Sequence, residues 1–453
     1  MLNYDIQAGF SRVNITPPLG IDMGGYFIQR IADGILDNLE INTLALRKQD
    51  KTVLLMAFDT LGMWKEYVER LKDAITKATD IPADAILIHS THTHTSGRLG
   101  NGPALTPQET AYGEYVLQAS VTAAVNAIQD LKNSKLGLGV SEAKHIAFNR
   151  RYLMKDGSTR TNPGVNNPDI VQCIGLLDEQ VNVLRFLRED GSNLVIVNFG
   201  NHPDTIGGTK ISADWPGFTR RTLERALENT KCIVFNGAQG DINHVNVFPK
   251  GGDLNDMFLD FDNVSRGYGH SRHLGNVLAG AVMQVYDKVT FTNVDELNYV
   301  QKTIFVRSNK PKTEEMEEAR YIHQMHMNGK DSELPYAGML LTTAVADAAR
   351  KIRMENSPDY LPLPLSAIKI GNIAFVGIPG EPFAGIGIAL KETEGWDMIL
   401  PCCMANAKEG YFPMKDSYEE GGYEAKSSPF ASGVAEQIIQ EGVSLLHNLK
   451  NNS

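Results

Sequence analysis

The chain has 453 residues, of which 42% are hydrophobic and 21% are charged, and its formal net charge is −11. This composition is typical of a globular protein, and the acidic balance argues against nucleic acid or an anionic membrane as the main partner. No apolar run reaches the length of a membrane span, and the N-terminal segment has no basic or apolar leader pattern.

Apolar runs alternate with segments of helical spacing along the chain. The predicted strands cover 52–63, 85–90, 193–204, 232–241 and 372–381, and the predicted helices cover 64–79, 114–131, 216–228 and 273–286. The repeated order of strand, turn and helix predicts an α/β fold in which mixed sheets are flanked by helices. We interpret 1–453 as one domain, with an irregular acidic loop or flap at 253–266 and a charged helical segment at 307–360.

The number and spacing of the cysteines indicate the redox state of the compartment in which the protein works. The four cysteines contain no CxxC pair, and Cys402 and Cys403 are sequence neighbours, which rarely bridge each other. We therefore expect free thiols and a reduced, cytoplasmic protein. The sequence does not indicate the oligomeric state.

Polar side chains follow five separate predicted strands, at the point where each strand ends. The C-terminal ends of strands are where open α/β sheets build their sites, so we expect a common site there. The residues at these positions are Asp59, His92, His94, His202, Asp241 and Glu381.

The stretch "STHTHTSG" places His92 and His94 two residues apart, directly after a strand. Extended backbone would point both imidazoles to the same side, and neutral imidazole is the commonest metal ligand. His202 could add a nitrogen and Glu381 an oxygen, a set that suits zinc better than calcium or magnesium. The structural alternatives are that His202 is a hydrogen-bonded loop residue and that Asp59 caps the following turn or helix.

Several motifs occur in an order that resembles the neutral/alkaline ceramidase superfamily, over residues of about 5 to 435. The motifs are "AGFSRVNITPP", "MGGY", "STHTHTSG", "FNR", "NFGNHP", "IPGE" and "NAKEGYFPMKDSYEEGGYEA". The resemblance implies a mixed α/β catalytic domain with one zinc ion per chain, here without the immunoglobulin-like C-terminal domain of the family.

The resemblance also implies roles for seven residues. The implied zinc ligands are His92, His202, Glu381 and Tyr411. The residues implied to contact the substrate or its oxyanion are His94, Arg150 and Tyr423. These roles are chemically sound, because zinc polarises bound water while charged and phenolic donors stabilise a developing oxyanion.

One motif departs from the family, whose nucleophilic serine lies in a turn of the form "GDVSPN". Here the turn reads "GDINHVN", so Asn243 takes the place of the serine and His244 that of the proline. An asparagine cannot attack, so we expect zinc-activated water to attack directly, with Asp241 or His94 as the proton-transfer group. Asn243 and Asp59 are then candidate substrate contacts.

The predicted function is therefore zinc-dependent hydrolysis of an amide, ester or lactone bond in a small soluble substrate. One alternative is a metal-dependent phosphoesterase, which would bind two metals and needs more carboxylates. The other is a protein that keeps the zinc pocket for binding and has no catalytic activity.

Overall fold

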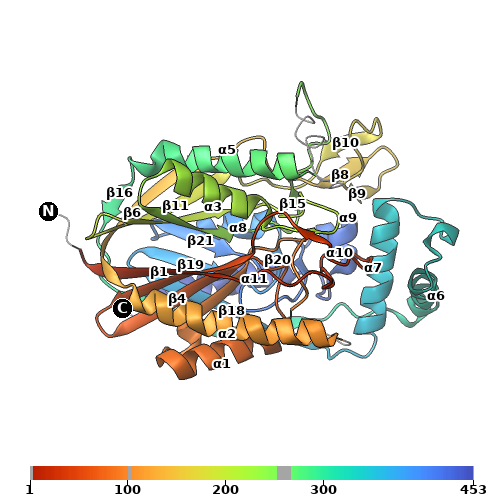
Figure 1. Ribbon diagram of the computed structural model, residues 1–453. Helices are drawn as coiled ribbons and strands as arrows, with labels where there is room; N and C mark the ends of the chain where they lie inside the picture. The colour runs from red at the N-terminus through yellow and green to blue at the C-terminus, as the bar shows by residue number, and fades with distance from the viewer. Residues whose placement is uncertain (1–3, 100–104, 253–266, 452–453) are drawn as a thin grey trace.

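In the computed structural model, which describes residues 4–99, 105–252 and 267–451, two β-sheets stack face to face (Figure 1). Leu44 and Leu54 of the first sheet and Phe375 and Leu400 of the second belong to one apolar core. Helices cover the outer faces, which confirms the predicted class of mixed sheets flanked by helices. The flap predicted at 253–266 lies outside the described residues.

The larger sheet has nine strands in the order β14-β12-β11-β6-β1-β3-β4-β5, with β16 beside β6. The pairs β12–β14 and β4–β5 are parallel, and the other neighbours are antiparallel. The whole of β12 and most of β4 are buried, which explains their near-continuous apolar sequences. The strand bounds are β1 Ile6–Asn14, β3 Glu40–Lys48, β4 Lys51–Phe58, β5 Ile86–Ser90, β6 Lys132–Glu142, β11 Gln180–Arg188, β12 Asn193–Phe199, β14 Thr230–Asn236 and β16 Thr290–Thr292.

The second sheet has four strands in the order β17-β18-β19-β21, and four small sheets connect the loops at the strand ends. The second sheet consists of β17 Leu297–Arg307, β18 Tyr360–Ile370, β19 Ile373–Gly377 and β21 Met398–Cys402. The small sheets pair β10 Ile170–Cys173 with β8 Arg151–Met154 and β9 Thr159–Thr161, β13 Lys210–Ile211 with β2 Gly34–Ile35, β15 Ile242–Asn243 with β7 Phe148–Asn149, and β20 Glu381–Pro382 with β22 Tyr411–Phe412.

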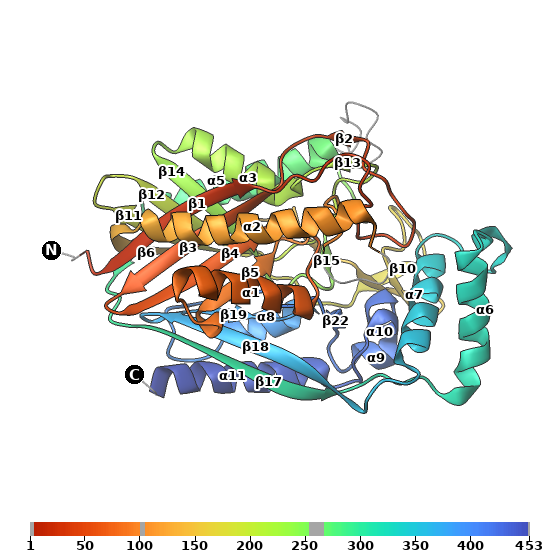
Figure 2. The same cartoon turned by 60° about the horizontal axis from the view of Figure 1, so that its bottom comes forward.

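The helices form the two outer layers and one lateral group (Figure 2). Helix α2 crosses β1 and β3, α3 and α5 cover the other part of the larger sheet, and α8 and α11 cover the second sheet. Helices α6 and α7 pack on each other at one end of the molecule, next to α10. The helix bounds are α1 Lys65–Thr79, α2 Pro107–Gln129, α3 Asp214–Ala226, α5 Tyr268–Tyr286, α6 Met316–Met327, α7 Met339–Met354, α8 Ala384–Lys391, α9 Ser417–Glu420, α10 Tyr423–Ser427 and α11 Val434–Asn451, with short 3-10 turns at Ala83–Ala85, Thr313–Glu315 and Asp331–Glu333.

The prediction for the second helix, 114–131, is wrong at its start, because α2 begins at Pro107. Thr106 accepts a hydrogen bond from the Glu109 amide, and the Glu109 side chain accepts one from the Thr106 amide. This capping box, with proline in the first turn, starts the helix before its apolar stripe begins. The other three predicted helices agree with α1, α3 and α5 within a few residues.

All four cysteines are free thiols, as predicted. Cys402 and Cys403 are buried at the end of β21, where burial raises the pKa of both thiols, so neither is a reactive thiolate. Within the described residues, none of the helices combines the length and the apolar character that a bilayer crossing requires.

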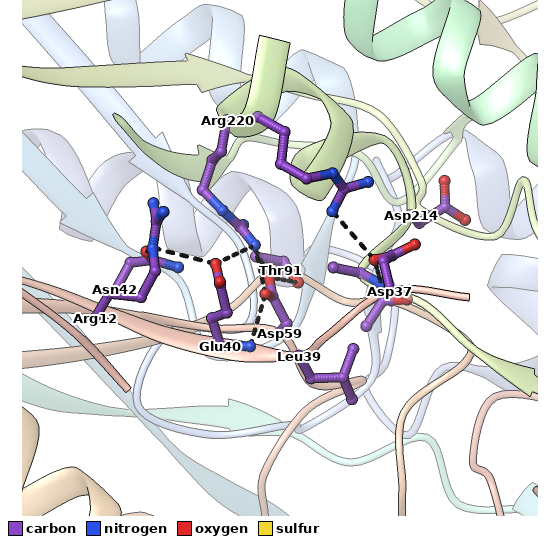
Figure 3. A network of polar contacts seen from close by, with 12 residues as sticks. Arg12, Asp37, Leu39, Glu40, Asn42, Asp59, Thr91, Asp214 and Arg220 are labelled. Atoms are coloured by element: carbon purple, nitrogen blue, oxygen red, sulfur yellow. Dashed lines mark hydrogen bonds and ion pairs between the residues drawn. The ribbon is translucent and has the colours of Figure 1, made fainter. Parts of the chain in front are cut away.

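A chain of ion pairs connects α3 to β1, β3 and the end of β4 (Figure 3). Arg220 donates to both carboxylate oxygens of Asp59, at 3.0 and 2.6 Å, and its Nη2 lies 3.3 Å from Glu40. Arg12 joins Glu40, at 3.2 Å, to Glu224, at 2.6 Å. Burial raises the pKa of the Asp59 carboxyl, and the adjacent Arg220 guanidinium opposes that rise.

Asp59, which we predicted to contact the substrate, is fully buried in this network instead. Beyond the two bonds from Arg220, its carboxylate accepts a hydrogen bond from the Glu40 amide at 3.0 Å. Both oxygens are thus engaged in holding the end of β4. The strand-end position alone did not distinguish this structural role from a role in the site.

Replacing Arg220 by methionine should lower the free energy of unfolding by about 3–5 kcal/mol, because it leaves the buried Asp59 carboxylate without its counter-ion. Urea denaturation at neutral pH measures the change. The control is Arg70→Met, whose ion pair with Glu114 at 2.6 Å is largely exposed. Equal losses in both variants would contradict a dominant role of the buried pair.

Candidate functional site

Three histidines and one glutamate meet beyond the ends of β5, β12 and β19. His92 and His94 follow β5, His202 follows β12, and Glu381 lies in β20 shortly after β19. The Nε2 atoms of His92 and His202 lie 3.3 and 3.2 Å from the same Glu381 oxygen, Oε2. The Nε2 atoms of His92 and His94 are 3.3 Å apart. The structure thus brings together four side chains that strand-end position had selected.

Backbone hydrogen bonds tie the loops that carry these residues to one another. The His92 amide donates to the Thr60 carbonyl at 2.9 Å, and the His94 amide donates to the Pro203 carbonyl at 3.1 Å. The extended backbone that we assumed is wrong at His92, whose φ of 75° lies in the left-handed region. The chain turns directly after β5, and the two rings face each other from a strained loop rather than a strand.

The Nδ1 atoms of two histidines are held by main-chain carbonyls. His92 Nδ1 lies 2.6 Å from the Leu61 oxygen, and His202 Nδ1 lies 3.0 Å from the Gln239 oxygen and 3.2 Å from that of Ile242. A carbonyl can only accept, so Nδ1 carries the proton in both rings. Each Nε2 then presents a lone pair toward Glu381, which is the usual arrangement of metal-binding histidines.

The charge states fit a cation at the centre of this group. Burial lowers the pKa of both His94 and His202, so these rings are neutral near pH 7. Burial acts to raise the pKa of Glu381, whereas positive charge at the position of the facing His92 and His202 rings lowers it well below its usual value. Neutral nitrogen lone pairs and an ionised carboxylate at 3.2–3.3 Å repel one another unless a cation lies between them.

Unsatisfied atoms lead to the same conclusion. His202 Nε2 and Glu381 Oε2 are both buried and lack a hydrogen bond. The two atoms lie 3.2 Å apart, but this contact does not satisfy the geometry of a hydrogen bond. Buried polar atoms normally have partners, and a metal ion would supply one here. Among the described residues, the group able to hold a metal comprises His92, His94 and His202, whose ligand atoms lie within 4.8 Å of one another.

Tyr411 joins this group through backbone pairing. It is the register partner of Glu381 in the parallel pair β20–β22, and its ring stacks on His202 with centroids 6.5 Å apart. Burial and the Glu381 carboxylate raise the pKa of Tyr411, while Arg150 opposes the rise. Tyr411 is therefore a neutral phenol that accepts a hydrogen bond from Arg150 at 3.2 Å.

Arg150 and Tyr423, the two residues implied to stabilise an oxyanion, lie on either side of Tyr411. Arg150 donates to Glu424 at 2.7 Å and to the Gly240 carbonyl at 2.7 Å, which fixes its guanidinium. The Tyr423 ring contacts the Tyr411 ring edge-on at 5.6 Å. Burial raises the pKa of Tyr423, so its hydroxyl keeps its proton and can donate.

Asp241 is held on both oxygens. Oδ1 accepts a hydrogen bond from the Ala384 amide at 2.8 Å, and Oδ2 accepts one from Asn149 at 2.7 Å. Burial raises the pKa of the Asp241 carboxyl to about 6. Its main-chain carbonyl accepts from the Arg150 amide at 2.9 Å, so this residue positions Arg150.

Asn243 is also buried, and both ends of its amide are engaged. Its Nδ2 donates to the side-chain oxygen of Asn162 at 2.9 Å, and its Oδ1 accepts from the Val245 amide at 3.0 Å. The next residue, His244, places Nδ1 3.2 Å from an Asp204 oxygen. These contacts stabilise the turn at the position where the family carries its serine.

Sequence reasoning did not identify the residues that hold His94. An added Cβ on Gly25 would lie 2.8 Å from His94 Nδ1, so only glycine leaves room for this ring. Tyr26 contacts the ring edge-on at 5.7 Å, and Arg30 donates to the His94 carbonyl. The "MGGY" motif was the signal, but its spacing carried no indication of a histidine 69 positions away.

Purified without added metal, the protein should contain about one transition-metal ion per chain. The double variant His92→Ala, His202→Ala should lose it, because both inward-facing nitrogens are removed. Elemental analysis measures the content, and His447→Ala, which changes an exposed histidine of α11, is the control. Full metal content in the double variant would contradict the assignment.

No protein-family profile matches the sequence, and no curated protein sequence matches it. Solved structures do match. The neutral ceramidase from Pseudomonas aeruginosa superposes with a TM-score of 0.76 and 16% identity, covering 100% of this chain and 75% of that chain. A ceramidase complexed with C2 gives a TM-score of 0.75 and 16% identity, covering 100% and 76%. The chain therefore has the fold of the neutral ceramidases, as its motifs predicted.

Proposed function

We propose that the protein is a zinc-dependent hydrolase that cleaves an amide, ester or lactone bond of a small soluble substrate. The observation that carries the proposal is the buried convergence of two inward-facing histidine nitrogens on the Glu381 carboxylate. The shared fold supports an amide hydrolase, since its structural neighbours are ceramidases. The four free thiols favour a reducing compartment, which we take to be the cytoplasm.

The residues that would hold the ion are His92, His202, Glu381 and Tyr411. Two nitrogens with oxygen donors suit zinc better than calcium or magnesium, which prefer shells made of oxygen alone. When bound, such an ion supplies Lewis-acid polarisation of the substrate carbonyl and makes water more acidic. His94 adjoins these ligands, and we assign it to proton transfer rather than to the metal.

We assign to Arg150 and Tyr423 the stabilisation of negative charge on the substrate oxygen. Arg150 is already fixed by Glu424 and Gly240, so little reorganisation is needed when charge develops. Tyr423 contributes a neutral hydroxyl donor from the start of α10. Fixed donors of this kind act most strongly where water is excluded, and Arg150 is buried while Tyr423 is half-buried.

His94 is the group best suited to move the proton. Its pKa is lowered by burial, so it is neutral and able to accept, and its Nδ1 has no hydrogen-bond partner among the described residues. Gly25 and Tyr26 hold the ring in place. Asp241, our other candidate, has both oxygens engaged, and we assign it to positioning.

Asn243 excludes a serine mechanism at its position, and we propose that water attacks the substrate directly with no acyl-enzyme. The same residue favours the second candidate, a binding protein that retains the metal pocket without turnover. A phosphoesterase with two metals has less support, because the metal-binding group of the described residues is a single one.

The test of direct attack uses the metal-loaded protein in excess over p-nitrophenyl acetate, quenched in acid within one turnover. Mass spectrometry should find acetate and p-nitrophenol formed with no acetyl group on the chain. An acetylated side chain that forms and decays at the turnover rate would contradict the mechanism. Unchanged ester and a full complement of zinc, repeated across amides and lactones, would favour the binding protein.

Replacing Tyr423 by phenylalanine should lower kcat by about 100-fold or more, because one oxyanion donor is lost while the ring remains. His94→Gln should reduce kcat by a factor of about 100 to 10,000 if the imidazole moves the proton. Both variants should keep their metal. Tyr360→Phe, at an exposed position of β18, is the control and should leave kcat unchanged.

A further inference from the structure

A cavity of about 360 Å³ adjoins the histidine cluster. Its wall includes Gly25 and Tyr26, which pack against the ring of His94. It also includes Leu61, whose carbonyl oxygen lies 2.6 Å from His92 Nδ1. Residues in the wall of this cavity therefore contact two of the histidines, which places the cavity next to the cluster.

Two cations line this cavity, and they differ in their partners. Arg98 is compensated, since Nη1 lies 3.3 Å from Asp22 and Nε lies 4.0 Å from Glu109. Lys408 has no carboxylate within ion-pair distance in the part of the chain that the structure describes. Its stem packs on Gly62, where an added Cβ would lie 2.9 Å from the Lys408 Cδ. The chain thus makes room for an ammonium group at the wall of a cavity and provides no ion pair for it.

Lys408 is half-buried, and removing part of an ammonium group's hydration without providing a counter-ion is costly, so an anion in the cavity would reduce that cost. Burial lowers the pKa of Lys408, and the Arg98 charge lowers it further, while Glu381 opposes both effects. Glu381 already faces His92 and His202, so its charge is directed to the metal position. Arg98 is already paired with Asp22 and Glu109, so a negative group beside Lys408 would supply the one ion pair that is missing from this wall.

A second cavity, of about 640 Å³, lies next to Tyr423. Thr161 and Gly422 line it, and the Thr161 hydroxyl accepts a hydrogen bond from the Tyr423 amide at 3.2 Å. Phe27, from the wall of the first cavity, contacts the Tyr423 ring at 6.4 Å. Tyr423 therefore touches the walls of both cavities, and a substrate that spans them would place its reacting carbonyl beside this tyrosine.

We propose that the cavity lined by Arg98 and Lys408 binds a carboxylate of the substrate, so that the enzyme acts on anionic N-acyl or ester compounds. This inference rests on the proposed hydrolase function and adds the charge of the substrate. N-acyl amino acids have the required chemistry, because each carries a hydrolysable amide a few bonds from a carboxylate. The larger cavity would then receive the remainder of the molecule.

The test compares N-hexanoylglycine with its neutral analogue N-hexanoylglycinamide by calorimetric titration of the metal-loaded protein. The acid should bind at least about tenfold more tightly, as expected for a charge-assisted hydrogen bond. Lys408→Met keeps the length and apolar stem of the side chain, and it should abolish the preference while the metal content stays unchanged. Lys330→Met, at an exposed lysine paired with Glu333 at 3.4 Å, is the matched control and should keep it.

Two further measurements distinguish binding in this cavity from binding at the metal. The preference for the acid should persist in metal-free protein, and acetate should bind much more weakly than N-hexanoylglycine. Equal binding of acid and amide, or a preference that survives Lys408→Met, overturns the proposal. So does a preference that vanishes with the metal, or acetate that binds as tightly as the acid. If the preference follows Lys408 but neither compound is hydrolysed, the anion site stands and only the hydrolase proposal fails.

Discussion

The buried ion pair between Asp59 and Arg220 is the constraint on which the geometry of the site depends. It joins α3, which follows β12, to the end of β4, across 161 positions of sequence. The residue after Asp59, Thr60, provides the carbonyl that receives the His92 amide. The ion pair therefore connects two parts of the site. It fixes the segment that accepts the His92 amide, and it ties that segment to the helix that follows His202.

The geometry of this site also creates an electrostatic repulsion that a bound cation would relieve. Nδ1 protons donated to main-chain carbonyls leave two lone pairs directed at the Glu381 carboxylate, and burial lowers the pKa of His202, so that ring does not relieve the repulsion by protonation. Around this centre, Arg150 and Asp241 are satisfied by neighbours and act as a rigid frame. The Asn243 turn belongs to the same frame, because both ends of its amide are engaged by neighbouring residues.

Strands and helices were predictable where their burial produces a local pattern of apolar residues in the sequence. Strands β4 and β12 are covered on both faces and appear as apolar runs, and α1 shows its stripe directly. Strands β1 and β6 are only partly buried, so the local pattern did not reveal them and their pairing depended on distant partners. The residues of the candidate metal site were selected because they follow strands or match motifs. The ion pair of Asp59 was not predictable because Arg220 is remote in sequence, and Lys408 was overlooked because a lysine in a polar stretch does not indicate a cavity wall.

The pairing of β20 with β22 has a consequence for how this site can change. Glu381 and Tyr411 are register partners, so the backbone ladder keeps their Cα atoms about one inter-strand spacing apart, on the order of 4.8 Å, whatever side chains they carry. The backbone at these two positions therefore stays in place when a side chain is replaced. In the proposed metal site, exchanging one donor type for another at these two positions would change the metal preference without rebuilding the loops that carry them.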